Sequence, residues 1–298
     1  MDGVGVTADG LGLRGPRGWA FRGVDVDAEP ASLIALEGPS GSGRTSLLLA
    51  LTGRMRTTEG TAAVGTARLP RQMAAVRRAS ALAHVAGVTD LEPALTVGEH
   101  LRERALLQRR FDGSVRDLLR PRAQREARTT SQIDAALAAA GLDREALPKG
   151  TRTAVRDLER IEALRLSVAL ALIGRPRLLG VDDIDLKLTD AERTEVWTLL
   201  RSLAEAGTTV LAVCGGEAPE DAVRVRTDTA PDSDPDSDPA AGSPTAQDGV
   251  RARSEEETVP TGAGKDDGHV PESGQGGTDA TTDDDEERAH AHAETGRA

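Results

Sequence analysis

The chain has 298 residues with 49 acidic and 37 basic side chains, and most of the negative excess lies in residues 227–298, which hold 19 acidic and 5 basic residues. Residues 1–226 hold 30 acidic and 32 basic residues, so neither part gives an electrostatic reason to expect a nucleic-acid partner. No apolar run approaches the roughly 18 residues of a membrane helix, and one cysteine, Cys214, excludes an internal disulfide, so we expect a cytoplasmic protein without a membrane span of its own.

The first informative element is a glycine-rich loop between two apolar segments. Residues 31–36 predict a buried strand and residues 46–51 a helix, because both runs are short and apolar. The loop and the residue after it are Gly38, Pro39, Ser40, Gly41, Ser42, Gly43, Arg44, Thr45 and Ser46. This is the P-loop pattern with arginine in place of lysine. Its glycines let the backbone wrap a phosphate, and the hydroxyl of Thr45 can reach magnesium. The alternative is a glycine-rich turn that caps an ordinary helix.

The next segments predict two strands followed by helices. Residues 57–65 fit a turn and a short strand, and residues 81–86 fit another strand. A capping box, Thr96 to Glu99, predicts the start of a helix that runs to about Leu107. We expect a second helix to begin at Ser131, because Ile133, Ala136, Leu137 and Ala140 then share one face before Gly141.

The strands and helices continue to alternate toward residue 214. Residues 156–173 predict a helix, residues 177–181 a short strand, and residues 208–214 a buried strand. A second capping box, Thr189 to Glu192, predicts a helix that ends before Gly207. We therefore expect an α/β fold of the P-loop NTPase type, in which helices flank a largely parallel sheet. The nucleotide-binding domain would comprise residues 1–226, with an inserted helical subdomain at about 96–165.

Residues 227–298 predict a disordered, acidic, low-complexity tail. Their only aliphatic side chains larger than alanine are Val250, Val259 and Val270, so they cannot bury enough apolar surface to offset the conformational entropy of folding. The tail is either a solubilising extension or a segment that docks on a specific partner.

A second phosphate-site element follows the strand at residues 177–181. Leu178-Leu179-Gly180-Val181 is apolar and is followed by two acids, Asp182 and Asp183. In P-loop proteins an aspartate at the end of a second buried strand helps to hold magnesium. The alternative is a plain turn at the end of a strand.

The order of these elements resembles the nucleotide-binding domain of ATP-binding cassette (ABC) transporters over about residues 10–216. Three further stretches support the resemblance: 21–25, 95–99 and 174–179. It implies that Gly38 to Thr45 is the Walker A loop, that Asp182 is the Walker B aspartate, and that both Thr45 and Asp182 serve magnesium beside ATP. Asp183 then stands where the family has a catalytic glutamate, and it is one methylene shorter.

Several positions depart from the family pattern. An ungapped count places Gly87 at the Q-loop glutamine and Gly215 at the H-loop histidine. The signature segment falls on Leu158-Glu159-Arg160-Ile161-Glu162, in which only the leucine is retained. Gly15 falls at the base-stacking aromatic, which leaves Trp19 either as the stacking residue or as a core residue. Arginine at position 44 keeps the charge but is larger than lysine, so we expect ATP binding to be retained but weakened.

These observations favour an ATP-binding subunit that couples to a separately encoded membrane permease, with hydrolysis weak or absent. The resemblance implies Mg-ATP as ligand, a homodimer or heterodimer of nucleotide-binding domains, and a position at the inner face of the plasma membrane through the permease. The alternative is a regulatory or scaffold pseudo-ATPase without a transport role. A P-loop kinase or an unrelated NTPase fits Arg44 and Asp182 but does not fit the three cassette-like stretches.

Overall fold

The structure is a computed structural model that describes residues 2–16, 18–111 and 121–227. All of these residues belong to one unit of the chain, Met1–Pro239. The predicted tail lies outside the described residues except for Thr227, its first residue, which is only 1 % exposed.

A parallel five-stranded sheet forms the centre of the fold, as the alternation of strands and helices predicts. Its strand order is β6-β7-β8-β3-β9, and all neighbouring strands run parallel. The strands are β3 (Leu33–Glu37), β6 (Ser80–Ala83), β7 (Leu178–Val181), β8 (Thr209–Cys214) and β9 (Val223–Arg226). Every residue of β3, β6, β7 and β8 is buried, which explains why these strands appear in the sequence as continuous apolar runs.

A second, antiparallel sheet was not predicted. It has the order β2-β1-β4-β5, with β1 (Val6–Gly15), β2 (Gly18–Ala28), β4 (Glu59–Val64) and β5 (Ala67–Leu69). Only β4 corresponds to an expected strand. Strand β1 contains Gly10, Gly12 and Gly15, and its pairing with β2 has several register shifts. Glycines and bulges interrupt the two-residue alternation by which such a strand is recognised in a sequence.

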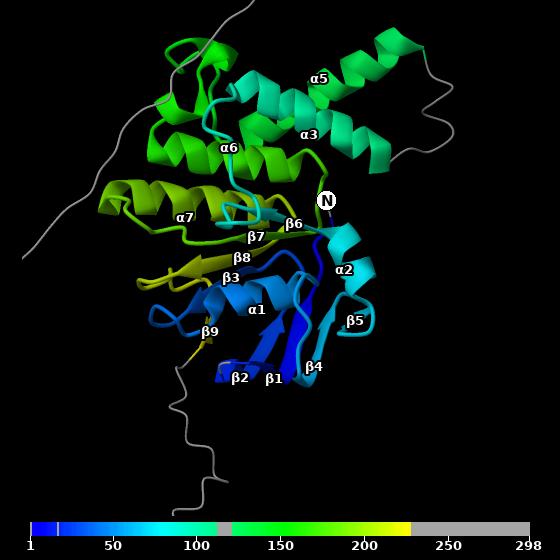
Figure 1. Cartoon of the computed structure of the whole chain (residues 1–298), viewed down its shortest axis with the longest axis vertical. Coiled ribbons are helices and arrows are strands. Elements are labelled where there is room, and N and C mark those ends of the chain that lie inside the picture. The colour runs from blue at the N-terminus through cyan, green and yellow to red at the C-terminus, as the bar shows by residue number, and fades with distance from the viewer. Residues whose placement is uncertain (1, 17, 112–120, 228–298) are drawn as a thin grey trace, which may run out of the picture. The chain divides into compact units, whose positions relative to one another are not determined.

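Helices cover both faces of the parallel sheet (Figure 1). Helix α1 (Arg44–Leu51) lies between the two sheets, whereas α6 (Arg160–Leu172) and α7 (Asp190–Glu205) cover the opposite face. The alternation of side chains along β3 divides the core accordingly: Ile34 and Leu36 pack with α1, and Leu33 and Ala35 pack with the α6 and α7 side. The carboxyl ends of β3, β7 and β8 therefore meet at the start of α1.

The remaining helices of the described residues are α2 (Met73–Ala79), α3 (Val97–Phe111) and α5 (Arg122–Ala139), with two short 3-10 helices at Gly150–Arg152 and Val155–Asp157. The capping box at Thr96 is confirmed, since Glu99 N–H donates to Thr96 Oγ1 at 3.2 Å and Thr96 N–H donates to Glu99 Oε2 at 2.7 Å. Within the described residues, no helix is both long enough and apolar enough to cross a membrane.

Four predicted boundaries are wrong. The helix expected to end at about Leu107 continues to Phe111. Ser131 does not begin a helix but lies inside α5, because residues 122–130 include several strong helix formers and no breaker. The helix expected over 156–173 is broken at Leu158 and Glu159, whose ψ angles of 144° and 159° are extended. Strand β6 ends at Ala83 rather than residue 86, because His84 has φ 55° and turns the chain away from the sheet.

Candidate functional site

The predicted P-loop connects β3 to α1 and has the backbone that its glycines permit. Gly38, Gly41 and Gly43 have φ angles of 155°, 83° and 83°. A Cβ atom on Gly43 would lie 1.9 Å from the carbonyl oxygen of Ala20 in β2, so this position has no room for a side chain. Pro39, Ser40 and Gly41 are exposed at the tip, while Ser46 lies half-buried in the first turn of α1. The loop thus presents backbone N–H groups at the start of a helix, where phosphate binds readily.

The structure brings Thr45 and Asp182 together although they are far apart in sequence. Thr45 Oγ1 donates to Asp182 Oδ1 at 3.2 Å, and the N–H of Asp183 donates to the same oxygen at 3.1 Å. Asp182 is 3 % exposed, and this burial raises its pKa, while the hydrogen bond from Thr45 acts in the opposite direction. A buried carboxylate beside a hydroxyl at the start of α1 is chemically suited to a divalent cation.

A magnesium ion at this place would need further ligands. Within residues 2–16, 18–111 and 121–227, no group of three or more His, Cys, Asp or Glu side chains is placed to hold a metal. Magnesium usually takes one or two protein ligands and completes its octahedron with nucleotide phosphates and water. The pair Thr45 and Asp182 fits this mode of binding.

His84 lies close to Asp183, and the sequence did not lead us to it. Asp182 N–H donates to Ala83 O at 3.3 Å, so His84 follows β6 beside the end of β7. His84 N–H donates to Ser167 Oγ of α6 at 2.7 Å. Burial lowers the pKa of His84, and the negative charge of Asp183 opposes this effect. Gly87, the expected Q-loop position, lies three residues beyond His84 and offers only its backbone.

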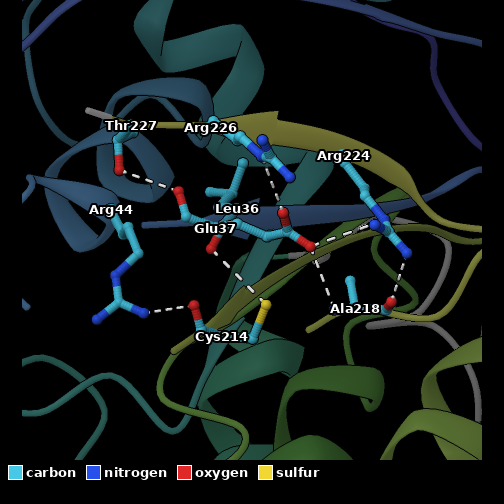
Figure 2. A network of polar contacts seen from close by, with 8 residues as sticks. All are labelled: Leu36, Glu37, Arg44, Cys214, Ala218, Arg224, Arg226 and Thr227. Carbon is cyan, nitrogen blue, oxygen red and sulfur yellow. Dashed lines mark hydrogen bonds and ion pairs between the residues drawn. The ribbon is translucent and has the colours of Figure 1, made fainter. Parts of the chain in front are cut away.

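Arg44 and Gly215, two residues that depart from the family pattern, lie next to each other in the structure. The guanidinium of Arg44 donates to the carbonyl of Cys214, at the end of β8 (Figure 2). A Cβ atom on Gly215 would lie 3.5 Å from Arg44 Nη1. A side chain at position 215 would therefore lie directly against the guanidinium of Arg44. Burial raises the pKa of the Cys214 thiol to about 12, so this thiol stays protonated at neutral pH.

The start of the P-loop is tied to the end of β9 (Figure 2). The hydroxyls of Ser42 and Thr227 are 2.6 Å apart, and Thr227 N–H donates to the carbonyl of Glu37 at 2.8 Å. The Glu37 carboxylate lies 3.5 Å from Arg226 Nε and 3.8 Å from Arg224 Nε. These contacts fix Glu37, which directly precedes the loop, and Ser42, which lies within it, against β9 and Thr227, the last described residue.

The residues at the family's signature position serve the start of α6. Glu159 precedes the helix, and its N–H donates to the carboxylate of Glu162 at 2.8 Å. Ile161 is 7 % exposed and belongs to the core on the α6 and α7 side of the sheet. Two of the replaced residues therefore have structural roles, a helix cap and a core contact, instead of leaving a glycine-lined surface.

Trp19 lies beside the P-loop but is not a core residue. It is half-buried on β2, next to Ala20, whose carbonyl faces Gly43. The guanidinium carbons of Arg22 and Arg14 lie 4.6 and 5.6 Å from the centre of a Trp19 ring, which is cation–π geometry. The interpretation of Trp19 as a buried core side chain is therefore not supported.

The parallel sheet, the left-handed glycines and the adjoining Thr45 and Asp182 define the P-loop NTPase fold. Comparison with known proteins narrows this class, because a sequence profile described as ABC transporter matches residues 21–185, more than half of the chain. The chain belongs to the ABC transporter family, as its resemblance predicted.

Two relatives illustrate the similarity. The chain is 30 % identical to the Nod factor export ATP-binding protein I of Cupriavidus metallidurans over 63 % of this chain and 55 % of that protein. It is 33 % identical to the Fe(3+) ions import ATP-binding protein FbpC of Streptomyces avermitilis over 64 % of this chain and 49 % of that protein. The chain thus spans about half the length of these curated relatives.

Solved structures show the same fold. The ATP-binding cassette MJ0796, described as a dimeric post-hydrolysis state bound to ADP and Pi, has a TM-score of 0.54 and 20 % identity, covering 71 % of this chain and 88 % of that chain. The structure of cbiO1 from Clostridium perfringens has a TM-score of 0.57 and 16 % identity, covering 71 % of this chain and 78 % of that chain. The expected fold class is confirmed.

Proposed function

We propose that this chain is an ABC-type ATP-binding subunit that binds Mg-ATP through residues 38–46 and Asp182. The observation that carries the proposal is the contact of 3.2 Å between Thr45 Oγ1 and Asp182 Oδ1 at the start of α1. These two side chains would hold one magnesium ion, which would offset the negative charge of the phosphates, while the N–H groups of the loop would hold the phosphate oxygens.

We further propose that hydrolysis is weak or absent. Asp183 directly follows Asp182, and its side chain is shorter than the glutamate of the family, so it would hold an attacking water differently. A misplacement of about 1 Å can cost on the order of a hundredfold in rate. Gly215 offers no side chain to a γ-phosphate, and Glu159 and Glu162 would bring negative charge toward a partner's nucleotide. The imidazole of His84 lies close enough to Asp183 for the charge of Asp183 to affect its pKa, but it follows β6, whereas Gly215 follows β8.

Coupling to a membrane permease and pairing of two nucleotide-binding domains are proposals of the same kind. The names of the two relatives describe ATP-binding proteins of an export and an import process, and the MJ0796 cassette is described as dimeric. We propose that this chain likewise works as a homodimer or heterodimer at the inner face of the plasma membrane, held there by a separate permease.

A regulatory or scaffold role without transport is the second candidate. It is favoured by the structural use of Glu159 as a helix cap and of Ile161 as a core residue at the signature position. Recovery of a multi-span permease with the tagged chain from native membranes supports transport. Recovery of soluble partners alone supports the scaffold role.

The proposed binding function is tested by titration of the purified full-length chain with ATP, with and without magnesium. We expect a magnesium-dependent rise in melting temperature and a calorimetric binding signal, with little turnover. Rapid ATP turnover that Asp183→Asn abolishes would contradict the proposal of weak hydrolysis. Absence of any signal from ATP would contradict the proposal of binding.

Substitution of Arg44 by lysine should tighten ATP binding. The guanidinium of Arg44 now donates to Cys214 O, whereas the compact ammonium of lysine fits within the loop and can reach phosphate oxygens. Since a hydrogen bond to a charged group contributes about 1.5–3 kcal/mol, the gain in affinity should be on the order of tenfold. Calorimetric titration measures this gain in affinity. Arg78→Lys, at an exposed position of α2, is the matched control. Equal affinities of the Arg44→Lys variant and the original chain would show that Arg44 already serves the phosphates.

A further inference from the structure

The carboxylate of Asp185 holds the loop that follows β8. Its Oδ2 accepts hydrogen bonds from the backbone N–H groups of Gly215 and Gly216, both at 2.8 Å. Successive backbone N–H groups that converge on one oxygen form a small anion-binding site. In this chain a carboxylate of the protein itself occupies that anion-binding site.

A turn after β7 brings Asp185 to this loop. Asp183 has φ 45°, a left-handed backbone conformation that turns the chain after the end of the strand. The N–H of Ile184 then donates to the carbonyl of Val213 in β8 at 3.1 Å. The segment after Asp183 therefore runs beside the end of β8, which puts the carboxylate of Asp185 next to Gly215.

The loop that Asp185 holds faces the P-loop. Strand β8 pairs with β3 on one side and with β7 on the other, so its carboxyl end lies between the P-loop and Asp182. Gly215 and Gly216 line a cavity of about 340 Å³ together with Gly38 and Pro39 of the P-loop. The carboxylate is thus fixed at the side of the nucleotide site opposite the P-loop.

The negative charge of Asp185 is not balanced by a cation. None of the ion pairs in the described parts of the chain includes Asp185. Two guanidinium groups lie near this loop, but Arg44 donates to the carbonyl of Cys214 and Arg193 donates to the carboxylate of Asp190. Burial raises the pKa of the Cys214 thiol, and the charge of Asp185 raises it further, so this charge acts on the end of β8.

We propose that Asp185 disfavours the third phosphate of a nucleotide, so that the site prefers a nucleoside diphosphate to the triphosphate. This inference rests on the proposed binding of nucleotide through residues 38–46. The N–H groups of a P-loop hold the first two phosphates, and a triphosphate has one phosphate more to place beyond them. That phosphate would meet a fixed carboxylate and two N–H groups that are already occupied. Repulsion between two negative charges is stronger in a partly desolvated site than in water.

Titration with ADP and with ATP measures this preference. Calorimetry on the full-length chain, at one magnesium concentration, gives the ratio of the two dissociation constants. We expect the original chain to bind ADP at least as tightly as ATP. Asp185→Asn removes the charge and keeps an oxygen that can accept from Gly215 and Gly216. It should therefore shift the ratio toward ATP by about tenfold, through tighter binding of ATP and with little change for ADP.

Asp25→Asn is the matched control. Asp25 is exposed on β2 of the antiparallel sheet, and its Oδ1 accepts from the N–H of Gly10 at 2.7 Å. The substitution removes the same charge and keeps an oxygen that can accept from a backbone N–H, so the ratio should not change. Urea denaturation shows whether each variant is folded, and Asp185→Ala takes the place of Asp185→Asn if the latter is not.

The outcomes separate this inference from the proposed function. If both nucleotides bind but the ratio is unchanged by Asp185→Asn, or changes equally in Asp25→Asn, the inference is overturned and the proposed binding function stands. An original chain that binds ATP clearly more tightly than ADP would overturn the inference in the same way. Failure of the original chain and of both variants to bind either nucleotide would contradict the proposed binding function as well.

Discussion

Replacement of Gly43 by alanine should abolish ATP binding and lower the free energy of unfolding by about 3 kcal/mol or more, since strain and overpacking act together. Gly43 has φ 83°, and a Cβ atom there would lie 1.9 Å from the carbonyl oxygen of Ala20 and 2.6 Å from its carbon. Both atoms belong to the backbone of β2, which is held by its pairing with β1. The clash can therefore be relieved only by moving the P-loop or the sheet. Urea denaturation and calorimetric titration with ATP measure the two effects.

Gly41→Ala is the matched control for this prediction. Gly41 has the same φ of 83°, but a Cβ atom there would meet nothing within 4 Å. Its substitution should therefore cost only the left-handed backbone penalty, roughly 1–2 kcal/mol. Equal destabilisation by the two substitutions would show that backbone strain, rather than contact with Ala20, determines the need for glycine at position 43.

Asp182→Asn should remove magnesium-dependent ATP binding and at the same time stabilise the nucleotide-free protein. Burial raises the pKa of Asp182 above its ordinary value of 3.8, so the folded protein binds this proton more tightly than the unfolded chain does. Stability contributed by protonated Asp182 is complete below 3.8 and is lost as the pH rises through the raised folded pKa. At pH 7 the ionised carboxylate therefore opposes folding. Asparagine removes the charge and keeps an oxygen that can accept from Thr45 and Asp183.

The loss of ATP affinity should be on the order of a hundredfold or more, since changes even in outer partners of a metal ligand cost 10- to 100-fold. The measurements are urea denaturation without nucleotide at pH 7 and thermal shift with ATP, with and without magnesium. Asp183→Asn removes a charge from the adjacent residue and should leave magnesium-dependent binding in place. A variant Asp182→Asn that binds Mg-ATP as tightly as the original chain would contradict the assignment of Asp182 to magnesium.

The sequence determined those parts of the protein that depend on neighbouring residues. The P-loop pattern, the apolar strand before Asp182 and the capping boxes at Thr96 and Thr189 were predicted and are found in the structure. Each rests on interactions within a few residues, such as a side chain that accepts from a backbone N–H three residues later. The family resemblance follows from the same local stretches in their order along the chain.

The tertiary structure decided everything that joins distant residues. The sequence offered Arg44 and Gly215 as separate departures, and only the fold shows that the guanidinium reaches the end of β8. The same holds for the contact of Ser42 with Thr227 and for the position of His84 near Asp183. Strand pairing and side-chain contact across more than a hundred residues depend on register and packing, which no local pattern encodes.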